Sequence, residues 1–591
     1  MNKTNIVENK DKKIFFLFVF IILLFLIFLF VMLNTIMHPR NLPSKYITNV
    51  SKAQRGEIIS ADGFHLATTT KLYEAEINTR YLDDNKTDLF VKLFSIYSGI
   101  DSHIIENKIK AVNRKGKGRV ILSYNIAEKE AQYLKNLKSE FRRFQIFIEQ
   151  KDSKGRSNIH GLSIKESGEK RSYPYGTLLT PVIGYPIKSE ETLFTYVGGV
   201  KGLEKCFNNE LAPLQDSSEK GLRDVNGNVI LNNKSLVKNM KHGLDIQLTI
   251  PVSIQKKVEK MLDEMKFKTK SKQIMVAVMD IKNSNILTIA SSNRFLPRGI
   301  KRTDYPSLRP SMVEYSFEAG SVIKPITYAL LLDKKRITPN ELVNGHNGRF
   351  RIGRKVITDE HKFSWISADN VIVHSSNIGI AQLADKLSNY EFYQGLLDFG
   401  FSIKSTPDLM NERVGSIPTT RQLKSKIYKA TTSYGYGMRV NLMQLIRAYS
   451  VFNNDGKMLT PRIVDCFINR DGTKIPRETH QAISIIRKNT ATLVKNTLIK
   501  TVQQGTGRKT IIKGLEIGGK TGTAHIVEKG KYVNKYNTSF VGFANDKKAR
   551  YTIGVVVIQP KSSQFASKTA VPVFKKTVEL MIEDGYLKPT I

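Results

Sequence analysis

Cysteine is almost absent from this chain, which contains two in 591 residues. Cys206 and Cys466 stand 260 positions apart, and neither belongs to a pair at redox or metal-ligand spacing. Their scarcity excludes a small disulfide-stapled scaffold and a cysteine-rich metal centre. We expect two isolated thiols in the folded chain, and one disulfide between them is the alternative.

Histidine and acidic residues are also scarce. The ten histidines include no HExxH pair, so no metal site and no cofactor is predicted. Asp and Glu number 53 against 92 Lys and Arg, which gives a formal net charge of +39. The cations are spread along the whole length without an arginine-rich block, as a Lys- and Asn-rich codon bias would spread them. A basic surface facing anionic lipid headgroups or cell wall polymer is the functional alternative.

A long apolar run stands near the N-terminus. Residues 14–33, IFFLFVFIILLFLIFLFVML, are twenty consecutive apolar positions, and as a helix they would span about 30 Å of hydrocarbon. Lysines precede the run within residues 1–13, which favours a cytoplasmic N-terminus. The following NTIMHPR has no small-residue cleavage site. We therefore predict an uncleaved single-pass anchor in the inner (cytoplasmic) membrane, with the rest of the chain outside and away from nucleic acid.

The remainder divides into two parts by pattern. After a linker at residues 34–50, residues 51–243 alternate short apolar runs with charged segments and turn residues, which predicts a β-rich pedestal. From residue 244 a helix-like VSIQKKVEKMLDEM leads into two strand-like runs, then several helices, then three more strands near the C-terminus. The fold class is α/β. We expect residues 244–591 to form one sheet, assembled from both ends of the domain and covered by helices.

Ser321 and Lys324 stand in EAGSVIKP at the predicted start of a helix. Positions i and i+3 share a helix face, so Lys324 can reach the Ser321 hydroxyl. A serine becomes a good nucleophile when a base takes its proton, and a lysine can be that base if burial and nearby cations lower its pKa. The same spacing recurs in pairs that we interpret as solvated, which begin at Ser167, Ser217, Ser235 and Ser253.

An SxN pattern follows in HSSNIGIA, with Ser375 and Asn377. A second hydroxyl can relay the proton towards a leaving amine, and an amide can hold the substrate backbone and the lysine. The residues Ser291-Ser292-Asn293 match the same pattern. This copy precedes Ser321 at a predicted strand end, so we interpret it as structural.

The third motif is GGKTGTA, with Lys520, Thr521, Gly522 and Thr523 on a strand-like run. Lys520 would supply positive charge for a substrate carboxylate, and Gly522 would let a peptide or ring approach the strand closely. The backbone N–H groups of Thr523 and Ser321 could form an oxyanion hole. An exposed strand end is the structural alternative for this sequence.

The order of these motifs is more informative than each motif alone. Ser375 follows Ser321 by 54 residues, and Lys520 follows Ser375 by 145. SxxK, SxN and KTG in this order form the motif set of the penicillin-recognising serine enzymes. Over nearly its whole length, the chain resembles a class B penicillin-binding protein.

The resemblance extends beyond the triplet. RGEIISADGFHLA, RSYPYG and GLEKCFNNEL, which hold Arg55, Arg171 and Glu204, are similar to pedestal motifs of the family. QQGTG and SFVGFAN are similar to its transpeptidase domain. SYGYG and VVVIQP resemble the septal division enzyme, the penicillin-binding protein 3 type, and the elongation enzyme of the protein 2 type is the alternative. Pro251 after LTI and TLLTPVIGYP after RSYPYG depart from the family pattern.

The resemblance implies a peptidoglycan D,D-transpeptidase with a dimerisation-type pedestal and a β-lactamase-like catalytic sheet. Ser321 would attack the D-Ala–D-Ala bond of a donor stem peptide, release D-alanine and pass the acyl group to an amine of a neighbouring stem. A β-lactam would leave a slowly hydrolysed acyl-enzyme. The implied partners are a polytopic membrane glycosyltransferase of the SEDS type and division proteins. The implied catalytic residues are Ser321, Lys324 and Ser375, and the implied substrate-binding residues are Asn377, Lys520, Thr521, Gly522 and Thr523.

Two other classes of protein compete with this interpretation. A β-lactamase or D,D-carboxypeptidase must deliver water to the acyl-enzyme, and no ExxLN-like deacylation motif stands between Ser375 and Lys520. A β-lactam sensor would carry its SxxK domain behind several membrane spans and a protease module, neither of which we find in this sequence, and a pure scaffold would tolerate loss of the triplet, which is intact. For the pedestal, we expect Arg55, Arg171 and Glu204 to meet near the domain junction, with solvated surface charges as the alternative.

Overall fold

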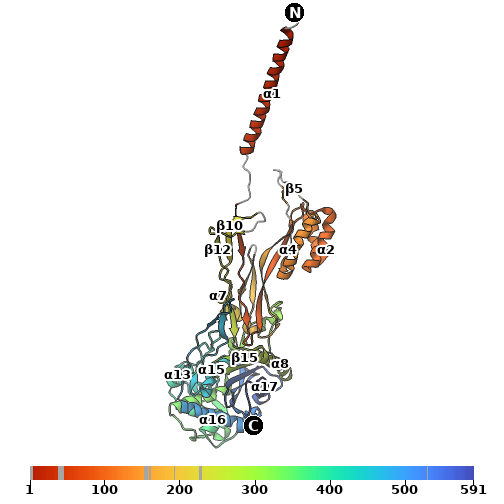
Figure 1. The fold of residues 1–591 in the computed structure, drawn as a ribbon. Helices are drawn as coiled ribbons and strands as arrows, with labels where there is room; N and C mark the ends of the chain where they lie inside the picture. Colours follow the sequence, from red (N-terminus) through yellow and green to blue (C-terminus); the bar gives the residue numbers. More distant parts are fainter. Residues whose placement is uncertain are drawn as a thin grey trace. The chain divides into compact units, whose positions relative to one another are not determined.

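The computed structural model describes residues 4–37, 45–148, 150–151, 157–158, 161–191, 194–224, 229–528 and 530–590 (Figure 1). The chain divides into two compact units. The first unit combines Met1–Ser51 with Asp216–Met240, and the second combines Lys52–Gln215 with Lys241–Ile591. The two thiols are free, as expected, with Cys466 buried and Cys206 partly buried.

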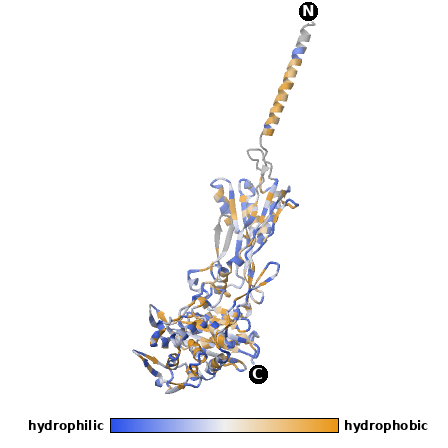
Figure 2. Cartoon of the chain, turned by 90° about the vertical axis from the view of Figure 1, so that its left-hand side faces the viewer, coloured by the Kyte–Doolittle hydropathy of each residue, from blue (hydrophilic) through white to orange (hydrophobic). Residues whose placement is uncertain are grey.

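The first unit contains the apolar helix and a small sheet. Helix α1 (Thr4–Met37) includes a segment of 27 residues, Asp11–Met37, that is long and apolar enough to cross a membrane. Figure 2 shows apolar residues along most of its length. The helix extends past both ends of the predicted span because no Gly or Pro interrupts the sequence before Pro39. The antiparallel sheet consists of β1 (Tyr46–Ser51), β10 (Ser217–Arg223), β11 (Val229–Ile230) and β12 (Leu236–Lys238).

In the second unit, residues 52–215 contain the predicted strands and three helices that the sequence analysis did not predict. Helices α2 (Thr87–Ser98), α3 (Ser102–Asn113) and α4 (Glu128–Arg143) pack over β3 and β4 around a separate small core. Their buried residues recur three or four positions apart, as Ala131, Leu134, Leu137 and Phe141 do in α4, so the helical pattern was present in the sequence and was missed. The strands are β2 (Ile58–Ile59), β3 (His65–Asn78), β4 (Arg119–Ala127), β7 (Ser163–Ser172), β8 (Pro186–Glu191) and β9 (Phe194–Gly199).

These strands belong to a sheet that continues into the C-terminal half of the chain. Its order is β22-β21-β13-β2-β3-β7-β9-β8, and β4 pairs with β3. The link is made where β2 pairs in parallel with β13 (Asp245–Leu248), and β13 pairs in turn with β21 (Val464–Ile468), which pairs with β22 (Lys474–Pro476). The predicted domain boundary at residues 243–244 thus falls inside one hydrogen-bonded sheet, and it stays a prediction.

The predicted sheet assembled from both ends of the domain is confirmed. Its antiparallel order is β15-β14-β26-β25-β24, where β14 and β15 come from residues 273–291 and the other three from residues 516–558. Alternate residues of β14 enter two different cores, Ile274 and Val276 on one face and Met275 and Ala277 on the other. Burial on both faces explains why these strands read as continuous apolar runs. The strands are β14 (Gln273–Asp280), β15 (Ile286–Ser291), β24 (Glu516–Glu528), β25 (Lys531–Asn545) and β26 (Arg550–Ile558).

Helices cover both faces of this sheet. On one face lie α8 (Val252–Thr269) and α17 (Ala570–Glu583). From the other core, α15 (Leu442–Asn453) and α16 (Lys488–Gln504) contact the sheet. Further helices of this core pack on them and on one another: α10 (Lys324–Asp333), α11 (Ala368–Val373), α12 (Asn377–Ala384), α13 (Asn389–Asp398) and α14 (Lys426–Ser433). The remaining short elements include α5 (Thr180–Ile183), α6 (Gly202–Cys206), α7 (Asn208–Leu211), α9 (Ser311–Glu314), β16 (Leu342–Asn344), β19 (Trp365–Ser367), β20 (Lys457–Met458) and β23 (Ile483–Ser484).

A buried cluster of charges ties the pedestal segments together. Arg55 and Glu204 are both fully buried, and Arg55 donates from Nε and Nη2 to Glu204 Oε2 at 3.0 and 2.8 Å. Arg171 donates from Nε to Glu204 Oε1 at 2.8 Å. Burial would raise the pKa of Glu204, but the two guanidinium groups hold it below its ordinary value. The three residues therefore meet as expected, and the surface-charge alternative is wrong.

Glu204→Gln should lower pedestal stability strongly. Breaking a buried ion pair leaves uncompensated charge, which typically costs about 3–5 kcal/mol. Because the folded pKa of Glu204 lies below its unfolded value, its contribution is present above the unfolded pKa and is lost as pH falls through the folded one. Thermal unfolding across this pH range measures both effects. Glu106→Gln, which breaks the exposed pair with Lys110, is the control, and equal melting temperatures for the two variants would contradict the prediction.

Candidate active site

Ser321 and Lys324 lie at the start of a helix, as predicted. Ser321 belongs to the 3-10 turn Gly320–Ile323, and Lys324 begins α10 with Pro325 in the first turn, where its missing N–H is tolerated. Lys324 is fully buried. Its Nζ donates to the backbone carbonyl of Ser375 at 2.5 Å and to Ser375 Oγ at 3.1 Å. The lysine thus joins the first motif to the second.

Glycines let three backbone segments meet at Ser321. Gly320 has φ of +61°, and a Cβ on it would lie 2.8 Å from the carbonyl oxygen of Thr523. A Cβ on Gly435, in SYGYG, would lie 2.1 Å from the carbonyl oxygen of Gly320. A Cβ on Gly522 would contact Ser539 Oγ, Val322 and the Ala319 carbonyl. Gly522 therefore permits close packing of the serine turn on β24, a reason that the sequence analysis did not give.

Ser375 has an unusual backbone conformation. It follows α11 with φ of +61°, in the left-handed region that a residue with a Cβ adopts at a cost. The conformation ends the helix and directs the Ser375 carbonyl at Lys324. Strain of this kind is typical of functional sites. The SxN serine is thus held by the backbone as well as by its hydroxyl.

Asn377 is oriented differently from the prediction. Its side-chain amide donates to the Thr358 carbonyl at 3.0 Å, and within the described ranges it makes no hydrogen bond to Lys324. Asp359 holds this segment, because its carboxylate accepts the N–H of Asn377 at 2.6 Å, the N–H of Ile378 at 3.1 Å and the hydroxyl of Ser376. Sequence reasoning missed Asp359, because this residue stands seventeen positions before Ser376 and its contact with the helix start depends on the tertiary fold.

The KTGT residues lie on the edge strand β24, as predicted. Lys520 is fully buried, and its Nζ lies 3.3 Å from the Thr521 carbonyl and 3.5 Å from Thr521 Oγ1. Thr521 Oγ1 also pairs at 2.7 Å with Thr506 Oγ1. Thr506 belongs to QQGTG, a motif noted in the sequence without a role for this residue. Thr523 is partly exposed beside the serine turn.

The two lysines differ in their electrostatic surroundings. Burial lowers the pKa of Lys324 far below its ordinary range, and the positive charge of Lys520 lowers it further. Burial lowers the pKa of Lys520 to about 7, against the opposing charge of Glu360. The shift favours the neutral amine of Lys324, which can accept a proton, whereas Lys520 keeps part of its positive charge near neutral pH. Lys324 is therefore suited to act as a base, and Lys520 is suited to bind an anion.

The rate of acylation by a penicillin should fall as pH rises above about 7. The penicillin carboxylate stays ionised, whereas Lys520 loses its charge through its pKa of about 7, so anion recognition weakens on the alkaline side. The second-order acylation rate, followed with a fluorescent penicillin, measures this limb. Lys520→Arg keeps its charge throughout and should remove the limb. A wild-type rate that rises steadily through the alkaline range would contradict the charge role of Lys520.

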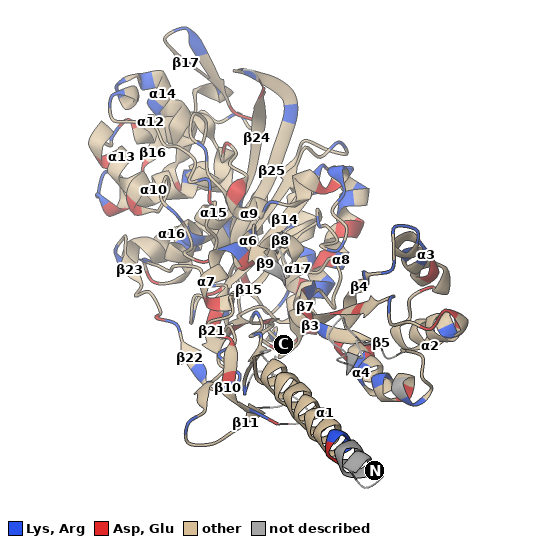
Figure 3. Ribbon diagram, turned by 90° about the horizontal axis from the view of Figure 1, so that it is seen from above, with Lys and Arg blue, Asp and Glu red and all other residues tan. Residues whose placement is uncertain are grey.

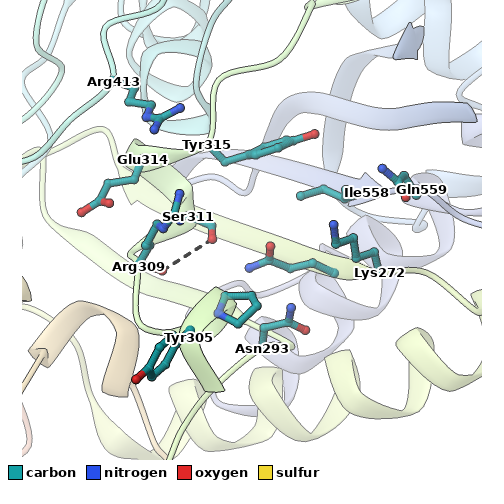
Figure 4. A pocket seen from close by; sticks show the side chains of 12 residues that line it. Lys272, Asn293, Tyr305, Arg309, Ser311, Glu314, Tyr315, Arg413, Ile558 and Gln559 are labelled. Atoms are coloured by element: carbon teal, nitrogen blue, oxygen red, sulfur yellow. Dashed lines mark hydrogen bonds between the residues drawn. The ribbon is translucent and has the colours of Figure 1, made fainter. Parts of the chain in front are cut away.

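The second SxN copy lies elsewhere and has structural partners. Ser291 Oγ accepts from Gln273 Nε2 at 2.9 Å, and Ser292 Oγ accepts the N–H of Ile274 at 2.9 Å. Asn293 lines a separate cavity of about 360 Å³ (Figure 4). Ser311 and Tyr315 also line this cavity, and none of the predicted catalytic residues does. The structural interpretation of this copy is supported.

Two family models match the chain. The model of the penicillin binding protein transpeptidase domain matches residues 274–579, and that of the penicillin-binding protein dimerisation domain matches residues 50–248. The chain belongs to the class B penicillin-binding proteins. As a class B penicillin-binding protein it is a D-Ala–D-Ala transpeptidase, and acyl transfer through a serine is characteristic of the family.

Relatives cover much of this penicillin-binding protein. It is 30% identical over 413 residues to the probable peptidoglycan D,D-transpeptidase PenA of Neisseria meningitidis, which covers 69% of this chain and 67% of the relative. It is 26% identical over 550 residues to the peptidoglycan D,D-transpeptidase FtsI of Buchnera aphidicola, covering 92% and 89%. The crystal structure of penicillin binding protein 2X from Streptococcus thermophilus has a TM-score of 0.73 at 20% identity, covering 92% and 82% of the chains, and supports the fold.

Proposed function

We propose that Ser321 is the nucleophile of this transpeptidase and that Lys324 is its general base. The observation that carries the proposal is the buried Lys324, which follows Ser321 by one helical turn. Its pKa is far below the ordinary range of a lysine, and its amine donates to the Ser375 hydroxyl. Ser321 Oγ attacks the carbonyl carbon of the penultimate D-alanine while Lys324 takes the hydroxyl proton. Ser375 passes that proton to the leaving nitrogen, the C–N bond breaks, and D-alanine departs.

The acyl-enzyme then reacts with an amine of a neighbouring stem peptide. That amine gives up a proton through the same groups in reverse, the Ser321 ester bond breaks, and a peptide cross-link forms. The N–H groups of Thr523 and Ser321 would stabilise the oxyanion in both steps, a contribution supported by the contact between the serine turn and β24. Lys520, Thr521 and Thr523 would bind the terminal carboxylate of the donor, and Asn377 would bind its backbone after a side-chain rotation away from Thr358.

The same residues would make this protein a target of β-lactams. A β-lactam presents a reactive carbonyl beside a carboxylate, as the donor stem does, so Ser321 would open the ring and Lys520 would bind the carboxylate. The leaving nitrogen stays tethered to the acyl group and blocks the acceptor amine. The result would be a slowly hydrolysed acyl-enzyme.

For its place in the cell, we propose that α1 anchors the enzyme in the inner membrane with the N-terminus in the cytoplasm. The length and apolarity of Asp11–Met37 support the anchor, and the lysines before residue 14 support the orientation. The catalytic residues would then lie outside that membrane. A polytopic SEDS-type glycosyltransferase and division proteins would be the partners there.

We propose a septal role, supported by SYGYG, VVVIQP and the likeness to FtsI. Depletion of the protein should therefore give filamentous cells, because septal cross-linking stops while elongation continues. Microscopy of a depletion strain measures cell length, and complementation by the wild-type gene is the control. Round cells would instead assign the enzyme to elongation.

A further inference from the structure

A basic hairpin lies next to the SxN segment. Strands β17 (Arg349–Ile352) and β18 (Lys355–Thr358) pair antiparallel through a two-residue turn, in which Gly353 has φ of +58°. We call residues 349–358 the basic hairpin. Figure 3 shows Lys and Arg gathered at its tip. Its four cations are all exposed: Arg349, Arg351, Arg354 and Lys355.

The hairpin holds these charges on a packed frame. Phe350 and Ile352 pack against the main core, and Ile357, which is opposite Phe350, is buried. Because side chains alternate along a strand, Arg349 and Arg351 project from the opposite, solvent-facing side. A ligand that binds them does not have to order a flexible loop.

The cations have no counter-charge of their own. In the part of the chain that the structure describes, their side chains make no hydrogen bond and no ion pair. The carboxylates that follow in sequence act elsewhere, since Asp359 holds α12 and Glu360 acts on Lys520. Like charges gathered on one strand pair without compensation destabilise it, and such a local conflict is typical of a binding surface.

Hydrogen bonds connect the hairpin and the residue after it to the SxN segment. The last residue of β18, Thr358, accepts the Asn377 amide, and the next residue, Asp359, holds Ser376 and Asn377. Ser375 immediately precedes Ser376, and its backbone carbonyl accepts a hydrogen bond from the Lys324 amine. The basic hairpin is therefore placed to meet the parts of a polymeric substrate that extend beyond the reacting bond, parts that a small β-lactam lacks.

We propose that the basic hairpin binds carboxylates of peptidoglycan stem peptides outside the reacting D-Ala–D-Ala unit. The inference rests on the proposed function. A glycan strand that carries several stem peptides is a polyanion, and guanidinium groups bind carboxylates through paired hydrogen bonds. Charge on the hairpin would attract the strand within a screening length of about 8 Å at physiological salt and hold it near Ser321. An anionic lipid surface is also negatively charged, but a lipid-binding hairpin would not need to be connected to Ser375 and Lys324.

The test compares Arg351→Glu/Arg354→Glu with Lys256→Glu/Lys268→Glu, which reverses two exposed lysines on α8. Binding of un-cross-linked, pentapeptide-bearing glycan strands is measured on the full chain in a Ser321→Ala background, so that no acyl-enzyme forms. Trp365, the only tryptophan, is 61% exposed on β19 and supplies a local fluorescence signal. We expect the hairpin change to weaken strand binding by about tenfold or more at low salt, with less effect at high salt, and the α8 change to leave it unaltered.

Further arms separate the alternatives. With an intact Ser321, both double variants should be acylated by a fluorescent penicillin at the wild-type rate, which shows that the site is folded, and Arg351→Lys/Arg354→Lys should restore strand binding. Strands with amidated stem carboxylates should bind wild type and the hairpin variant equally. Unaltered strand binding by the hairpin variant would overturn the inference, as would a loss confined to anionic lipid vesicles. If wild type binds strands through the hairpin yet forms no cross-links, the proposed function fails and the inference stands.

Discussion

Ser321→Ala should abolish covalent labelling of the protein by a fluorescent penicillin. In the proposed mechanism the acyl bond forms on Ser321 Oγ, and alanine offers no oxygen to form it. The fold should persist, because Ser321 is partly exposed and its turn is held by backbone contacts at Gly320 and Gly435. Gel fluorescence measures the labelling, and thermal unfolding checks the fold.

The control for this variant is Ser253→Ala. Ser253 begins another SxxK sequence, but it lies exposed on α8, so its loss should leave labelling at the wild-type level. Labelling that survives in Ser321→Ala and maps to a different serine would show that the nucleophile has been assigned wrongly.

Lys324→Ala should slow acylation by about 10²–10⁴-fold, the usual contribution of a general base. This range corresponds to about 3–5 kcal/mol of activation free energy. The loss follows from two roles of this amine, because it is the proposed base for Ser321 and it donates to the Ser375 carbonyl. Stopped-flow acylation with a chromogenic β-lactam measures the rate constant, and Lys324→Met, which keeps the side-chain length, should be slowed to a similar extent.

Lys429→Ala is the matched control for Lys324→Ala. Lys429 is also a buried lysine whose pKa is lowered by burial, but its amine donates to the Leu387 carbonyl. Its replacement should lower thermal stability and leave the acylation rate per folded molecule unchanged. Equal acylation rates for wild type and Lys324→Ala would remove the base role of Lys324.

Much of the fold could be predicted from sequence because its strongest signals are local. The twenty-residue apolar run predicted α1, and the strand-like runs at residues 273–291 and 516–558 predicted a sheet made from both ends of the domain. The three helices at residues 87–143 were missed although their buried residues recur at helical spacing, because the short apolar runs between charged segments were interpreted as strands. The passage of one sheet through Ile58 and Ile246 could not be predicted, since a two-residue parallel pairing leaves no pattern in the sequence.

The sequence predicted the motifs of the site, but it did not predict how their side chains are oriented. Spacing placed Lys324 one turn from Ser321, but the left-handed backbone of Ser375 and the orientation of Asn377 towards Thr358 depend on tertiary contacts. The same holds for Asp359, whose carboxylate binds a helix start seventeen residues later in the chain. Glu204 is different, because the resemblance to the family singled it out. Nothing else in the sequence shows that it lies between two arginines distant in the chain.

The parallel pairing of β2 with β13 matters for any attempt to isolate the catalytic part. A chain that begins at residue 244 keeps β13 and its partner β21 but loses β2, so the backbone at Ile246 and Gln247 becomes an open sheet edge. Ile246 and Leu248 are fully buried in the whole protein. Open edges with apolar side chains recruit strands from other molecules and promote aggregation. Because β2 also pairs with β3 of the pedestal, we expect a fragment that begins at residue 52 to aggregate less than one that begins at residue 244.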